Sequence, residues 1–174
     1  FSHVTSYEDV LYPDVVLKHI EDMQKKPFDG ILLRLKEYNH MSDIRPWSKA
    51  DLAPQFETLS KINWGRLNEN FLFLYATDRW DMDWFDDNHW SNITKNMKLL
   101  SKAGRIGKFV GICLDVEPYF EGVFQYPGPG DKYASRSIPE MEEIVRIRGK
   151  QFIKALQTDM PEMKLLMFLS MGIF

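Results

Sequence analysis

Residues 111–117 read Gly111-Ile112-Cys113-Leu114-Asp115-Val116-Glu117 and carry the clearest signal of the fold class. The even-numbered positions are large and apolar, as expected for a strand face that packs against helices. The odd-numbered positions change from small residues to acidic ones toward the C-terminal end of the stretch. This gradient suits the interior of a parallel barrel, which is tightly packed at one end and polar at the rim where active sites lie. The run at 30–36 has a similar alternation, with one parity formed by Gly30, Leu32, Arg34 and Lys36.

Strand-like and helix-like segments alternate along the whole chain. Apolar runs of strand length occupy residues 30–36, 70–77, 109–116 and 164–170. Between them, apolar residues recur at three- and four-residue steps, as they do on helices that cover a sheet. The alternation predicts βα units that feed a parallel sheet, either an open doubly wound sheet or a barrel.

The strand parity favours the barrel. We therefore predict an α/β fold, specifically a parallel (β/α) barrel of the TIM type with about four βα units in this sequence. Because a complete barrel typically needs about 250 residues, residues 1–174 are expected to form a single barrel-type domain, truncated at its C-terminus.

Local signals predict several helix ends. Pro13 and Asp14 indicate the start of a helix at 14–25, and Ser137 with Glu140 forms a capping-box pattern before another helix. A third helix is expected at 87–103, with Gly104 as its C-terminal cap. Trp90 has the spacing of the core-facing side of that helix.

Composition excludes several classes of function. The formal net charge is -3, and the basic residues are spread along the chain, so a nucleic-acid-binding surface is not expected. No apolar run approaches the roughly 20 residues that span a bilayer. The single cysteine cannot form an internal disulfide, and the four histidines lack the spacing of a zinc site. No metal and no cofactor are therefore predicted, and the oligomeric state is left open.

The acidic pair at the end of residues 111–117 is the candidate catalytic site. On an extended strand, Asp115 and Glu117 share one face, with Cα atoms about 6.6 Å apart. Carboxyls this close repel each other, which keeps one protonated as a general acid while the other stays ionised. Glycoside hydrolysis uses such a pair. We predict that Glu117 is the acid and that Asp115 assists it; the alternative is a solvated strand end with an ion pair to Arg34 or Lys36.

Aromatic and polar residues at the expected strand ends are candidates for substrate binding. Flat rings stack on sugars, and nearby polar groups bind their hydroxyls, so the predicted substrate contacts are Arg34, Trp47, Tyr75, Asp78, Trp80, Trp84 and Tyr119. The alternative is that these rings pack the loops onto the core. For Arg34 two roles are open, namely holding Asp115 ionised and contacting the substrate.

Three segments carry a resemblance to a known family, namely 28–31, 83–87 and 111–119. Together they resemble a bacterial family of TIM-barrel proteins classed as glycoside hydrolases. The D-x-E strand end is also similar to that of chitinase-type barrels, in which the Glu is the acid and the Asp assists it. Gly111, Cys113 and Val116 depart from the chitinase pattern, so the resemblance implies only the class of chemistry.

The sequence thus predicts a hydrolase of O-glycosyl bonds that acts on a poly- or oligosaccharide. The alternative is a carbohydrate-binding barrel without catalysis, and a structural or assembly role ranks third. The substrate class implies a secreted or periplasmic protein whose signal peptide lies outside this sequence.

Overall fold

The computed structural model describes residues 10–76, 81–117 and 124–168. Within these ranges, strands and α-helices alternate, which confirms the prediction of an α/β fold. The elements in chain order are α1 (Pro13–Met23), β1 (Leu32–Leu33), α2 (Lys49–Lys61), β2 (Phe71–Tyr75), α3 (Asp87–Ile106), β3 (Gly111–Asp115), the short 3-10 helix η2 (Pro129–Asp131), α4 (Ile138–Leu156) and β4 (Lys164–Phe168).

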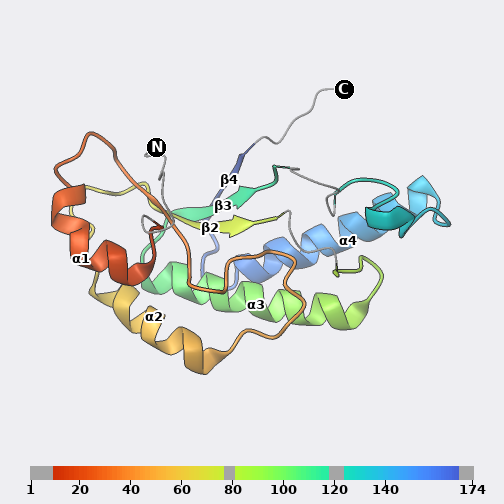
Figure 1. Ribbon diagram of the computed structural model, residues 1–174, viewed down its shortest axis with the longest axis horizontal. Helices are drawn as coiled ribbons and strands as arrows, with labels where there is room; N and C mark the ends of the chain where they lie inside the picture. The colour runs from red at the N-terminus through yellow and green to blue at the C-terminus, as the bar shows by residue number, and fades with distance from the viewer. Residues whose placement is uncertain (1–9, 77–80, 118–123, 169–174) are drawn as a thin grey trace.

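The strands form one parallel sheet in the order β1-β2-β3-β4. Crossovers between neighbouring parallel strands are nearly always right-handed, so a sheet in sequence order collects its helices on one face. Figure 1 shows α2, α3 and α4 below the sheet, and α1 packs beside α2. An open doubly wound sheet would reverse its strand order and place helices on both faces. The arrangement is therefore that of a partial βα repeat.

The two faces of the sheet differ as the strand parity predicts. The helix-facing side chains of β2 and β3 are register partners, Leu72 with Ile112 and Leu74 with Leu114. They belong to the core, where each is 6% exposed or less. Burial of this apolar face holds the helices on the sheet. Phe73, Tyr75 and Asp115 occupy the alternate positions on the other face and are half-buried.

The first strand is shorter than expected because its backbone finds partners outside the sheet. The amide of Ile31 donates to the side-chain oxygen of Asn70 (3.1 Å), and that of Arg34 donates to the carbonyl of Leu11 (3.1 Å). The side chain of Gln55 binds both the amide and the carbonyl of Lys36. The Ile31 bond takes the place of a backbone bond to β2, whereas the bonds of Arg34 and Lys36 join the backbone after Leu33 to Leu11 and to α2, and β1 has two residues.

The helix ends follow local sequence in part. The capping box is confirmed, since Ser137 Oγ accepts from the Glu140 amide (3.4 Å) and the Glu140 carboxylate accepts from the Ser137 amide (2.8 Å). The expected cap at Gly104 is wrong, because α3 continues to Ile106. Gly104 lies inside the helix, where an added Cβ would overlap the sulfur of Met160. The absence of a side chain at Gly104 thus permits Met160 to pack closely against α3.

The core is centred between the sheet and α3. Trp90 is 2% exposed and faces this core, as its spacing predicts. In the described ranges, no helix is both long and apolar enough to cross a membrane.

Candidate functional site

Polar side chains meet at the carboxyl ends of β1, β2 and β3, on the face opposite the helices. Tyr75 and Asp115 end β2 and β3 and are register partners. Since neighbouring strands lie about 4.8 Å apart, their side chains project from adjacent positions. Arg34 follows β1 directly, and its Nη1 donates a hydrogen bond to the Tyr75 hydroxyl. We call Tyr12, Arg34, Tyr75 and Asp115 the strand-end cluster.

Arg34 lies against two tyrosine rings. Its guanidinium carbon is 5.6 Å from the centre of the Tyr12 ring and 5.3 Å from that of Tyr75, within the range of cation–π attraction. Among the described residues, no carboxylate oxygen lies within 4.0 Å of Arg34, so the ion pair with Asp115, one of the two roles left open for Arg34, is absent. Lys36 pairs with Asp14 (2.8 Å) and not with the acidic pair.

Asp115 and Glu117 are linked by a hydrogen bond. β3 ends at Asp115, and the Glu117 amide donates to the Asp115 carboxylate (3.1 Å). This is the local turn that an aspartate makes with the backbone two residues on. The expectation that both residues lie on the strand is therefore wrong for Glu117, which lies on the segment that leaves the sheet. Both side chains belong to half-buried residues at the rim.

The Cys113 thiol lies on the same face of β3 as the Asp115 side chain. Burial, and secondarily the negative charge of Asp115, raises the pKa of the Cys113 thiol to about 12. The two side chains are two positions apart on β3 and therefore share the face opposite the helices. Val116 points the other way, because it lines an apolar cavity on the helix side. Cys113 is fully buried and remains a thiol at neutral pH, which excludes it as a nucleophile.

A loop segment extends the sheet beside Tyr75. The Tyr75 amide donates to the carbonyl of Asn39 (2.7 Å), and the Met41 amide donates to the carbonyl of Tyr75 (2.8 Å). This pairing brings the His40 ring to 5.4 Å from the Tyr75 ring, centre to centre. Sequence analysis missed both His40 and Tyr12 as site residues. No local pattern marks them, since each reaches the site through pairing or packing with distant segments.

Two of the predicted sugar platforms are buried. Trp47 is 5% exposed, and its indole nitrogen donates to the Asp43 carboxylate (3.2 Å). Trp84 is 4% exposed and stacks on Trp90, with ring centres 5.2 Å apart. Neither ring presents an open face of the size a sugar needs, so their burial favours the packing alternative. Three predicted contacts, Asp78, Trp80 and Tyr119, lie outside the described residues.

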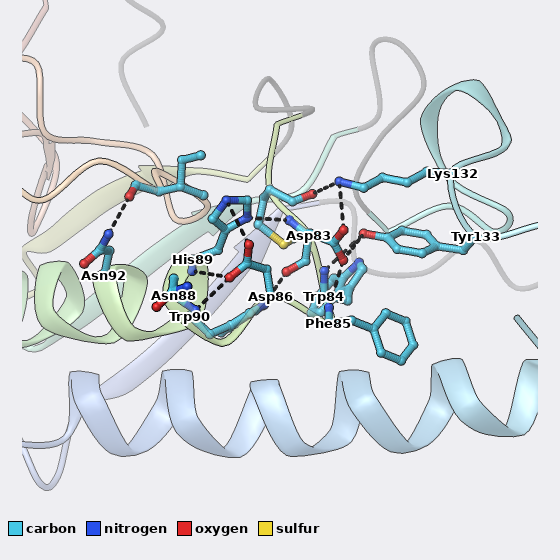
Figure 2. Close-up of polar contacts among 12 residues, drawn as sticks. Asp83, Trp84, Phe85, Asp86, Asn88, His89, Trp90, Asn92, Lys132 and Tyr133 are labelled. Carbon is cyan, nitrogen blue, oxygen red and sulfur yellow. Dashed lines mark hydrogen bonds and ion pairs between the residues drawn. The ribbon is translucent and has the colours of Figure 1, made fainter.

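A polar junction fixes the loop before α3 (Figure 2). Asp83 contacts Lys132 (3.4 Å) and accepts a hydrogen bond from the Phe85 amide (2.9 Å). Tyr133 accepts one from the amide of Trp84 (3.1 Å), and its hydroxyl lies 3.4 Å from Asp83. These contacts join the loop after β2 to the loop after β3. The carboxylate of Asp83 is thus engaged within the protein, and the junction positions the two loops.

The described surface has two hollows near the strand ends. A polar one of about 400 Å³ lies between α1 and α2 and is lined by Pro13, Asp14, Lys36, Glu37, Tyr38, Asp51, Pro54, Gln55 and Thr58. It borders the strand-end cluster, because the Lys36 amine lies 5.5 Å from the Tyr12 ring centre. An apolar one of about 350 Å³ lies on the helix side of β3 and β4. Within the described ranges, no three His, Cys, Asp or Glu residues are grouped as a metal site.

Comparisons of the chain with known protein families, with curated proteins and with solved structures gave no significant match.

Proposed function

We propose that this protein is a glycoside hydrolase whose site lies at the carboxyl ends of the strands. One observation carries the proposal: an acidic residue, Asp115, ends a buried parallel strand beside Tyr75, whose hydroxyl binds Arg34, and Glu117 follows two residues later. Carboxylates at this end of a parallel sheet are placed where barrel enzymes bind substrates. The proposed substrate, a poly- or oligosaccharide, implies a protein exported from the cytoplasm.

We also propose that the sheet is part of a (β/α) barrel. Strands in sequence order with helices on one face support this, as do the small residues at the start of β3 and the acidic one at its end. The outer strand supports it too. Parallel strands are normally covered on both faces, yet Leu165 and Met167 of β4 are 41% and 40% exposed. A further strand and helix beside β4 would bury them.

In the proposed reaction, Glu117 protonates the leaving glycosidic oxygen as its bond to the sugar carbon breaks. The resulting Glu117 carboxylate then accepts a proton from the water whose oxygen forms the new bond to that carbon. The Asp115 carboxylate stabilises positive charge at the sugar carbon. Its hydrogen bond from the Glu117 amide fixes the carboxylate, which limits the reorganisation needed in the transition state. Tyr75 and Arg34 supply a ring face and hydrogen-bond donors for the sugar.

The test is Glu117→Gln, which keeps the shape of the side chain and removes its acid. Loss of a general acid typically costs about 100- to 10,000-fold in rate. Release of reducing ends would be measured across a panel of polysaccharides, with circular dichroism to check the fold. Glu142→Gln, on the exposed surface of α4, is the matched control. Full activity of Glu117→Gln would refute the assignment.

A second candidate is a carbohydrate-binding barrel without catalysis. One observation favours it, namely that the Asp115 carboxylate accepts a backbone hydrogen bond and so has a structural partner. Calorimetric titration with oligosaccharides distinguishes the two functions. Sugar affinity without product release in the wild-type protein would support binding alone.

A further inference from the structure

The charge balance of Arg34 differs from that of the other described arginines. Every other one has a carboxylate within 4.0 Å, namely Arg45, Arg66, Arg105, Arg136, Arg146 and Arg148. Arg148, which is 5% exposed, is bound to Asp87 at 2.7 Å. Arg34 is half-buried, and its described polar side-chain partner is the neutral phenol of Tyr75. Among the described residues, no anion therefore contacts its positive charge.

The guanidinium is also held in position. The rings of Tyr12 and Tyr75 lie against it, and the hydrogen bond to the Tyr75 hydroxyl fixes its Nη1. A guanidinium has five N–H donors, so most of them remain for a ligand. A guanidinium group that is already ordered loses little conformational freedom when it binds an oxyanion. Its planar geometry allows it to donate two parallel hydrogen bonds to one carboxylate.

We propose that Arg34 receives the anionic group of an acidic glycan, with the carboxylate of a uronic acid unit as the ligand. The inference rests on the proposed function and names its substrate class. Asp115 lies at the end of β3, where its negative charge would repel an anion, whereas Arg34 lies toward β1. The anionic group therefore binds over the β1–β2 end, and the bond to be cleaved lies over the end of β3.

The experiment compares matched sugars on matched variants. Calorimetric titration would use oligogalacturonate and oligoglucuronate, their carboxyl-reduced neutral forms, and sulfated forms of those neutral sugars. We expect wild-type protein to bind at least one acidic series more tightly than its neutral form. We expect Arg34→Gln to weaken that binding about 10- to 100-fold, as for the loss of hydrogen bonds to a charged group, and to weaken the binding of the neutral forms by a clearly smaller factor, because those sugars lose no charged partner.

Two further variants sharpen the result. Arg34→Lys keeps the positive charge but lacks the planar guanidinium group, so it should bind acidic sugars with intermediate affinity. It also provides the comparison with the wild type if Arg34→Gln does not fold. Arg146→Gln, an exposed arginine on α4 that pairs with Glu143, should match the wild type. Preference for sulfated over carboxylated sugars, lost in Arg34→Gln, would keep the anion site and overturn the uronic acid assignment.

The two proposals fail in different ways. Glu117-dependent hydrolysis of neutral sugars with no effect of Arg34→Gln on binding would overturn this inference and keep the hydrolase. Arg34-dependent binding of acidic sugars without hydrolysis would overturn the hydrolase and keep the anion site. Equal weakening of acidic and neutral sugars by Arg34→Gln would overturn the inference, and failure of every sugar to bind would overturn both.

Discussion

The loop at residues 43–47 is held to α3 by one buried side chain, Asn96, which is 1% exposed. Its amide nitrogen donates to the carbonyls of Asp43 (2.9 Å) and Arg45 (2.8 Å), and its oxygen accepts from the Trp47 amide (2.9 Å). Asn96→Ala would leave three backbone groups without this partner. At about 1 kcal/mol for each net hydrogen bond, we expect the free energy of unfolding to fall by about 3 kcal/mol.

The matched control is Asn92→Ala on the same helix. Asn92 makes one described bond, to the carbonyl of Ile44 (3.0 Å), so its loss should cost about 1 kcal/mol. For a chain of this size, 1 kcal/mol shifts the Tm by about 2–4 °C, which predicts about 6–12 °C for Asn96→Ala. Urea and thermal unfolding followed by circular dichroism measure both variants. Equal, small shifts would refute the reasoning that Asn96 anchors this loop.

Two further predictions concern protonation and capping. The raised pKa of the Cys113 thiol means that the folded state holds this proton more tightly than the unfolded chain, whose thiol titrates near 9.0. The contribution of this thiol to the free energy of unfolding is present below pH 9 and is lost toward pH 12, by about 1.4 kcal/mol per pH unit. Urea unfolding at a series of alkaline pH values should therefore show a shallower decline in the free energy of unfolding for Cys113→Ala than for the wild type. Identical slopes against pH would contradict this prediction. Ser137→Ala removes the capping box of α4 and should cost about 1 kcal/mol in urea unfolding, whereas Ser60→Ala, near the end of α2, should have a smaller effect.

Part of the candidate site could be predicted from sequence. The parity of β3 correctly placed Asp115 on the face opposite the helices, because side chains alternate strictly along a strand. The position of Glu117 could not be predicted in this way. Its backbone amide binds the Asp115 side chain, and this turn ends the strand. The substrate roles of Asp78, Trp80 and Tyr119 stay predictions.

The loop aromatics show a different limit. Their concentration near strand ends is a feature of the sequence, but burial depends on what packs against each ring. Trp84 stacks on Trp90 of α3, and Trp47 ends the loop that Asn96 anchors, with its own amide bonded to Asn96. A sequence pattern does not reveal such contacts between distant residues. The tertiary structure was therefore needed to decide whether these tryptophan rings are open to a sugar or packed against the core.

The parallel α/β fold, the sheet face that meets the helices and the capping of α4 could all be predicted from the amino-acid sequence. These features depend on periodicity and on hydrogen bonds between residues a few positions apart. The meeting of Tyr12, Arg34 and Tyr75 could not be predicted in this way, nor could the lack of a contacting carboxylate at Arg34 among the described residues. Such contacts join segments distant along the chain, and strand register and helix packing bring them together.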